Sequence, residues 1–243
     1  MQTLACPSTP RPWTGCPEPP APHAEAITMH RTRIKICGLT READLDAAVE
    51  AGADAIGFVL YAKSPRAVSA QRAGALARRL PPFVTPVLLF VNASAPEIQA
   101  AVQAVPHALL QFHGDETPAQ CRAPARPYLR AVRMGPGVDL LDCAASFSDA
   151  QALLLDAHVE GYGGGGKVFD WSLVLPGVAC RLVLSGGLNP ANVTDGIARL
   201  RPWAVDVSTG VESAKGIKDA GLMRRFCQAV RETDARLAAM QED

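Results

Sequence analysis

From Arg33 onward, short apolar runs alternate with longer segments in which apolar and polar positions follow a helical pattern. Eight apolar runs of strand length recur, at 33–38, 55–60, 85–91, 108–113, 128–134, 152–157, 181–185 and 204–208. Short apolar runs bounded by turn residues are typical of buried strands. The pattern therefore predicts strand–helix units repeated along about 210 residues.

The segments between these runs are rich in Ala, Leu, Arg and Glu and predict helices. One helix should follow Thr40, because Glu42 and Asp44 would occupy its first turn, where acidic residues are favoured. Further helices are expected at about 69–80, 95–104, 189–199 and 219–240.

Eight strands with helices between them predict a single (β/α)8 TIM barrel over residues 33–243. The alternative is a doubly wound open sheet, which carries its Gly-rich phosphate turn after the first strand. Here the Gly-rich turns follow the sixth, seventh and eighth strands, which favours the barrel. Neither an internal repeat nor a break in the pattern indicates a second domain.

Residues 1–32 follow neither pattern. They are rich in proline and contain no basic segment followed by an apolar one, as a signal peptide would. We expect a disordered Pro-rich extension, with translation from Met29 as the alternative start.

Composition narrows the class of protein. Apolar residues make up 48% and charged residues 20%, as in a soluble globular chain. The 24 basic residues equal the 24 acidic ones, which argues against a nucleic-acid binder with a basic face. No apolar stretch reaches the roughly 18 residues needed to cross a membrane. Seven irregularly spaced cysteines without a CxxC motif predict reduced thiols, no metal site and a cytoplasmic protein.

Two residues at predicted strand ends are candidates for acid–base chemistry. Cys37 closes the first strand and Asp156 closes the sixth. The carboxyl ends of barrel strands surround the mouth, where catalytic groups of such barrels lie. A thiolate removes a proton and a protonated carboxyl donates one. The alternative for Cys37 is a small buried thiol, whereas a charge at the end of an apolar run is costly unless it is paired or lies in a site.

The loops after the seventh and eighth strands predict a phosphate site. Gly186 and Gly187 precede Asn189-Pro190 at the start of a helix, and Ser208-Thr209-Gly210 lies in the next loop. Glycine lets the backbone approach an anion, and free N–H groups at a helix start point toward it. Taken singly, the first turn is equally typical of an ordinary entry into a helix.

Three further polar features are ambiguous from spacing alone. Arg66 is either a ligand for a carboxylate or phosphate, or a solvated loop arginine. His113 is either a polar contact at the mouth or a structural histidine. The run Gly163–Lys167 lacks the Ser or Thr of a P-loop, so it indicates a loop over the mouth or a plain linker.

Together these motifs resemble the phosphoribosylanthranilate isomerase family of tryptophan biosynthesis. The resemblance runs from about Ile34 to the final helix. It rests on Lys35–Thr40 (KICGLT), Ser64–Arg66 (SPR), Gln111–Glu116 (QFHGDE), Leu154–Asp156 (LLD), Gly161–Trp171 (GYGGGGKVFDW), Ser185–Pro190 (SGGLNP) and Asp206–Glu212 (DVSTGVE).

The resemblance implies an Amadori rearrangement of N-(5-phosphoribosyl)anthranilate that needs no cofactor and no metal. By position, Asp156 would be the general acid and Cys37 the general base. Arg66 would hold the anthranilate carboxylate, and His113 would contact the substrate. The phosphate would be held by Gly186, Gly187, Ser208, Thr209 and Gly210. The implied partner is this small molecule alone, bound by a monomer or a homodimer.

Two departures from the family pattern fall in one loop. The family usually reads Gly-Gly-Thr-Gly-Lys there and often continues with Thr, whereas this chain has Gly165 and Val168. The alternatives are the histidine-pathway isomerase of the same barrel class and a barrel that binds a sugar phosphate without catalysis. The first has aspartate where this chain has Cys37, and a barrel without catalysis has no chemical need for Cys37, Asp156 and Arg66 together.

Overall fold

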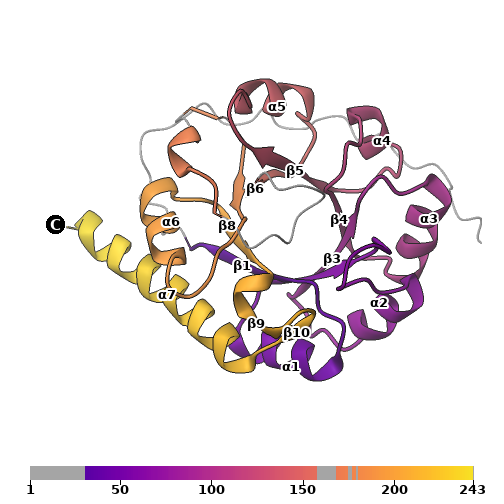
Figure 1. The fold of residues 1–243 in the computed structure, drawn as a ribbon, viewed down its shortest axis with the longest axis horizontal. Helices are drawn as coiled ribbons and strands as arrows, with labels where there is room; N and C mark the ends of the chain where they lie inside the picture. The colour runs from indigo at the N-terminus through magenta and orange to yellow at the C-terminus, as the bar shows by residue number, and fades with distance from the viewer. Residues whose placement is uncertain (1–30, 158–167, 175–176, 179, 243) are drawn as a thin grey trace, which may run out of the picture.

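Eight parallel strands close into a barrel. The computed structural model describes residues 31–157, 168–174, 177–178 and 180–242. The strands follow chain order around the barrel, and β1 pairs with β8 to close it (Figure 1). They are β1 (Arg33–Cys37), β2 (Ala55–Val59), β3 (Thr85–Phe90), β4 (Leu109–Phe112), β5 (Tyr128–Met134), β6 (Ala152–Ala157), β7 (Leu182–Leu184) and β8 (Ala204–Val207). The predicted TIM barrel and its eight strands are confirmed.

The helices form a ring outside the strands, as Figure 1 shows. They are α1 (Glu42–Ala51), α2 (Ala70–Ala77), α3 (Ala95–Ala104), α4 (Pro118–Arg122), α5 (Leu140–Ser146), α6 (Val193–Leu200) and α7 (Ala220–Glu242). The sequence missed α4 and α5, because five and seven residues are too few to show a helical period. Helix α6 begins later than expected, because the Asn192 amide accepts from the Asn189 N–H at 2.8 Å and forms a turn before the helix.

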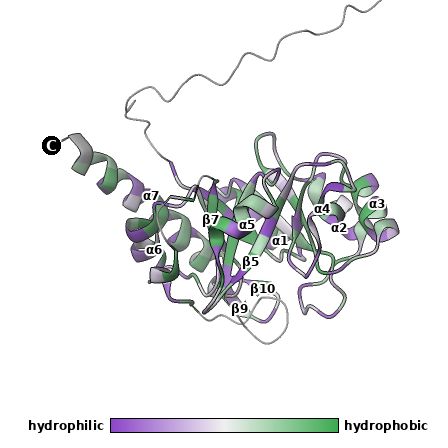
Figure 2. Cartoon of the chain, turned by 90° about the horizontal axis from the view of Figure 1, so that it is seen from above, coloured by the Kyte–Doolittle hydropathy of each residue, from purple (hydrophilic) through white to green (hydrophobic). Residues whose placement is uncertain are grey.

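Three apolar clusters pack around and within the barrel, and the smallest contains Cys37, Val59, Leu89 and Val91. The largest lies between the strands and the helices and includes Ile34, Ile36 and Leu88. A smaller one inside the barrel comprises Leu129, Ala131, Ala152, Leu154, Val183 and Ala204. Figure 2 shows the strands largely in the hydrophobic colour within the more mixed helices. Because side chains alternate along a strand, Lys35 and Cys37 share one face of β1, opposite to that of Ile34 and Ile36.

A small hairpin that the sequence did not predict follows β8. The chain passes through a 3₁₀ turn, η2 (Thr209–Val211), into β9 (Glu212–Ala214) and β10 (Ile217–Lys218), which pair antiparallel. Figure 2 places β9 and β10 at one end of the barrel. The Lys218 N–H donates to the Asp44 carboxylate on α1 at 3.2 Å. This hairpin brings two charged residues, Glu212 and Lys218, to the barrel mouth.

The N-terminal prediction stays untested, because residues 1–30 lie outside the described part of the chain. Thr32 is bound to α7 through its N–H and its hydroxyl, each 2.7 Å from the Asp234 carboxylate. The division into residues 1–32 and 33–243 remains a prediction. Among the described helices, none is both long and apolar enough to span a membrane.

Candidate active site

Cys37 lies at the carboxyl end of β1 and is 4% exposed. Gly57 stands opposite it in the β1–β2 register. A Cβ on Gly57 would lie 2.7 Å from the Cys37 sulfur, so the absence of a side chain there makes room for the thiol. Gly38 then turns the chain with a φ of 83°. The local sequence therefore places the thiol inward at the barrel mouth, as predicted from the strand end.

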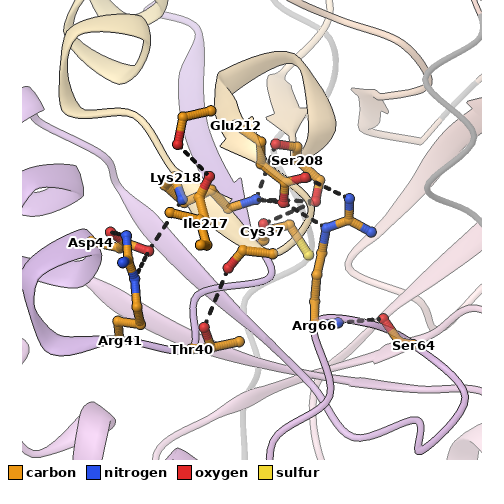
Figure 3. Close-up of polar contacts among 12 residues, drawn as sticks. Cys37, Thr40, Arg41, Asp44, Ser64, Arg66, Ser208, Glu212, Ile217 and Lys218 are labelled. Carbon is orange, nitrogen blue, oxygen red and sulfur yellow. Dashed lines mark hydrogen bonds and ion pairs between the residues drawn. The ribbon is translucent and has the colours of Figure 1, made fainter.

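Five buried charged side chains surround or support this thiol, and we call them the thiol cluster: Lys35, Arg66, Asp206, Glu212 and Lys218. The Lys35 ammonium donates to Asp206 Oδ1 at 2.7 Å. Glu212 accepts two hydrogen bonds from Arg66, both 2.7 Å long, and one from Lys218 at 2.9 Å. Figure 3 shows the Glu212 carboxylate between Lys218 and Arg66, with Cys37 beside them.

The pKa values within the thiol cluster follow from burial and charge. Burial raises the pKa of Cys37, while Lys35 and Lys218 lower it, and the net shift is upward. Burial lowers the pKa of Lys35, whereas the negative charge of Asp206 raises it, and the net shift is upward. Burial opposes ionisation of Glu212 as well, yet Arg66 and Lys218 leave its pKa lowered. Lys35 and Glu212 are therefore favoured in their charged forms by their partners.

Arg66 packs directly over the turn that follows Cys37. A Cβ on Gly38 would lie 2.5 Å from Arg66 Cδ, so only glycine allows this approach. Its Nε and Nη2 donate to Glu212, which holds the guanidinium in a two-point geometry. Its Nη1 has no hydrogen-bond partner among the described residues. That edge is available to a carboxylate, the ligand expected for Arg66.

Asp156 is the penultimate residue of β6 and is hydrogen-bonded to His113, which directly follows β4. His113 Nε2 lies 2.9 Å from Asp156 Oδ2, and the Ala157 N–H donates to Oδ1 at 2.9 Å. The Gln111 amide nitrogen lies 2.9 Å from His113 Nδ1. In this orientation of the Gln111 amide its nitrogen donates, so Nδ1 accepts and Nε2 is the side of the ring that donates to Asp156. His113 therefore contacts the candidate acid, and its predicted contact with the substrate stays a prediction.

The two glycine turns lie against each other. Gly186 and Gly187 have φ angles of 78° and 65°, a conformation that favours glycine. A Cβ on Gly210 would lie 1.9 Å from the Leu188 carbonyl oxygen, so the loop after β8 touches the turn after β7. A Cβ on Gly186 would lie 3.1 Å from Asp156 Oδ1, which places this turn beside the candidate acid.

Ser208 faces the thiol side of the site. Its hydroxyl donates to the Cys37 carbonyl at 3.0 Å, and Lys218 donates to the Ser208 carbonyl at 3.0 Å. Thr209 and Gly210, the other two residues expected to hold phosphate, begin η2. The loop after β8 therefore connects the thiol to the glycine turns.

Sequence reasoning assigned no role to Glu212, Lys218 or Gln111 and did not use the charges of Lys35 and Asp206. A signal was present for the last two, because each is a charged residue inside an otherwise apolar strand. Nothing in the sequence placed Lys218 at the mouth, since the hairpin that carries it is too short to show a strand pattern.

The predicted loop of residues 163–167 lies outside the described part of the chain. Within the described ranges, no group of three or more His, Cys, Asp or Glu residues is placed to hold a metal ion.

Comparisons with known proteins give a family match and several similar relatives. The family model described as N-(5'-phosphoribosyl)anthranilate (PRA) isomerase matches residues 34–229. The chain is 75% identical to the N-(5'-phosphoribosyl)anthranilate isomerase of Methylibium petroleiphilum, over 87% of this chain and 99% of the relative. It is 60% identical to that of Dechloromonas aromatica, over 84% of this chain and 98% of the relative.

Solved structures of the same kind are similar in fold. The phosphoribosyl anthranilate isomerase of Thermotoga maritima superimposes with a TM-score of 0.76 at 41% identity, covering 83% of this chain and 99% of that one. Another phosphoribosyl anthranilate isomerase was solved with reduced 1-(o-carboxyphenylamino)-1-deoxyribulose 5-phosphate. It has a TM-score of 0.73 at 39% identity and covers 83% of this chain and 99% of its own.

Proposed function

The chain belongs to the N-(5'-phosphoribosyl)anthranilate isomerase family, and we propose that Asp156 and Cys37 are the acid and base of its reaction. It is an isomerase of tryptophan biosynthesis. The substrate is N-(5-phosphoribosyl)anthranilate and the product is 1-(2-carboxyphenylamino)-1-deoxyribulose 5-phosphate. The observation that carries the residue roles is that both groups lie at the carboxyl ends of barrel strands at one mouth, with Asp156 hydrogen-bonded to His113 and Cys37 beside the charges of Lys35 and Lys218.

Asp156 begins the reaction as the general acid. Its proton passes to the ribose ring oxygen, the bond from that oxygen to C1 breaks, and the nitrogen lone pair forms a C1=N iminium. His113 holds Asp156 Oδ2 and the Ala157 N–H holds Oδ1, so the orientation of the carboxyl group is set. Such fixed geometry is what general acid catalysis requires.

Cys37 continues the reaction as the general base. The thiolate removes the proton from C2, and the C2–H electron pair forms a C1=C2 double bond while the iminium nitrogen becomes neutral. The resulting enolamine becomes the ketone when its hydroxyl proton is lost and C1 is protonated. In the closed barrel β1 and β6 are separated by β7 and β8, so acid and base approach the sugar from different parts of the mouth.

The two ends of the substrate carry the charges that fix it between these groups. Arg66 Nη1 faces the anthranilate carboxylate, while Glu212 holds the other edge of the guanidinium. The backbone of Gly186, Gly187, Thr209 and Gly210 binds the phosphate, with Ser208 supporting the turn from the Cys37 side. A bound molecule with an anion at each end therefore lies across the mouth.

A fluorescence assay that follows loss of the anthranilate adduct tests this function on the purified protein. We expect turnover by the wild-type chain and a loss of at least about 100-fold in kcat for Cys37→Ser, with KM nearly unchanged. Near-normal kcat in Cys37→Ser would remove Cys37 as the base. Absence of turnover by the folded wild-type protein would overturn the substrate assignment.

The remaining expectations concern partners and location. We expect a small-molecule substrate, a cytoplasmic protein with reduced thiols, and a monomer or a homodimer. One similar solved structure concerns monomers made from the dimeric enzyme of Thermotoga maritima. Light scattering on the purified chain measures which state this protein adopts.

A further inference from the structure

A thiol base must lose its proton before it can act. Burial of Cys37 at the end of β1 disfavours the thiolate that this loss produces. The net effect of its surroundings raises the pKa of Cys37. Within those surroundings, Lys35 is the strongest influence in the opposite direction. If Cys37 is the base, as proposed above, a neighbour that favours its thiolate form prepares it for the reaction.

Lys35 stands two residues before Cys37 on β1, so both side chains point to the same side of the strand. Asp206 stands opposite Lys35 in the β1–β8 register and accepts its ammonium hydrogen bond at 2.7 Å. The other Asp206 oxygen accepts from the Ser185 hydroxyl at 3.2 Å. The Lys35 ammonium is therefore fixed in place from a neighbouring strand.

The other two cations of the thiol cluster, Lys218 and Arg66, make their hydrogen bonds to groups other than Cys37. Lys218 donates to Glu212 and to the Ser208 carbonyl, and Arg66 donates twice to Glu212. An ammonium group has three donors. Lys35 makes one hydrogen bond to Asp206, and its charge also acts on Cys37, which lies on the same face of β1.

The charges of the thiol cluster also favour an anion at Cys37. Lys35, Arg66 and Lys218 are positive, while Asp206 and Glu212 are negative. The cluster therefore carries one net positive charge, and a Cys37 thiolate brings it to neutrality. Buried charges are tolerated when they are paired in this way.

We propose that Lys35, held by Asp206, is a positioning residue that stabilises the thiolate form of Cys37 and so prepares the base, a role that rests on the function proposed for Cys37. The role is separate from proton transfer, because Lys35 acts on the thiol and not on the substrate. Substituting Lys35 should therefore change the pH at which Cys37 ionises even when Asp206 has lost its charge, an effect that a lysine serving only to neutralise Asp206 would not produce.

The test compares Lys35→Met with Lys35→Met/Asp206→Asn. The single variant leaves Asp206 buried without its partner, which is destabilising and places an unbalanced negative charge near the thiol. The double variant removes that unpaired charge and is expected to fold even where the single variant does not. Lys215→Met serves as the control, since it removes an exposed lysine on the same hairpin as Lys218.

Ultraviolet titration of the thiolate gives a readout that does not depend on turnover. Each curve is measured against the same protein carrying Cys37→Ser, so the other cysteines cancel. We expect the midpoint to rise in the double variant and to rise further in the single variant, with the Lys215→Met control unchanged. A rise of about one pH unit lowers kcat at neutral pH about tenfold, and kcat should recover toward higher pH.

A wild-type midpoint in both Lys35 variants would overturn the proposal, and so would a double variant that matches wild type while only the single variant is shifted. The second result would mean that Lys35 merely neutralises Asp206. These failures are distinct from failure of the proposed function, which near-normal kcat in Cys37→Ser would reveal.

Discussion

A methyl group added at Gly57 should disable the thiol without unfolding the barrel. In Gly57→Ala the new Cβ would lie 2.7 Å from the Cys37 sulfur and 3.1 Å from the alpha carbon of Cys37. Favourable contacts between such atoms begin near about 3.5 Å, so the sulfur must move by roughly 0.8 Å or more. The alpha carbon belongs to the backbone of β1, which cannot yield as easily as a side chain.

The size of the effect follows from this displacement. Misplacing a reacting group by about 1 Å costs on the order of 100-fold in rate, so we expect kcat to fall between about 10- and 100-fold. Overpacking of a buried site costs about 1–3 kcal/mol of stability, which a domain of this size can tolerate. KM should change little, because the three atoms nearest to the new methyl group all belong to Cys37 and none to Arg66 or the phosphate turns.

The assay is steady-state kinetics by fluorescence, together with thermal denaturation. Gly74→Ala is the matched control, since its Cβ would lie 2.9 Å from the Ala104 carbonyl oxygen between α2 and the end of α3. That variant carries a comparable steric conflict far from the thiol and should keep its kcat. Wild-type kcat in Gly57→Ala, or an equal loss in Gly74→Ala, would refute the reasoning.

The remaining predictions concern the acid and the ion pairs. Asp156→Asn should lower kcat at least about 100-fold with a similar KM, and near-normal turnover would exclude it as the acid. His113→Asn should lower kcat by less than Asp156→Asn does, because it orients the acid without donating the proton; a larger loss would contradict this. Arg66→Ala should chiefly raise KM, and an unchanged KM would count against its carboxylate role. Arg66 and Lys218 hold the pKa of Glu212 below its usual 4.5, so their ion pairs stabilise the fold above that pH and are lost as pH falls through the lower folded value. Thermal denaturation should therefore show wild type more stable than Glu212→Gln at neutral pH, with the difference shrinking in acid; a constant difference would contradict this.

The strands could be predicted because each lies within an apolar run of five to seven residues bounded by turn residues. All eight apolar runs became barrel strands, and the strand-end residues Cys37 and Asp156 lie where the runs placed them. Helices α4 and α5 and the β9–β10 hairpin could not be found, because two to seven residues carry too little pattern. The hairpin then decided where Glu212 and Lys218 lie.

The sequence by itself determined the barrel, the strand-end thiol and carboxyl, and the glycine turns, because these depend on local pattern and local backbone chemistry. Only the tertiary structure decided the electrostatic surroundings of the thiol. Lys35 and Asp206 are 171 positions apart and meet because β1 pairs with β8 when the barrel closes. Arg66 and Glu212 are 146 positions apart and meet through the hairpin. Charge interactions depend on distance in space and on burial, and both are set by closure of the barrel.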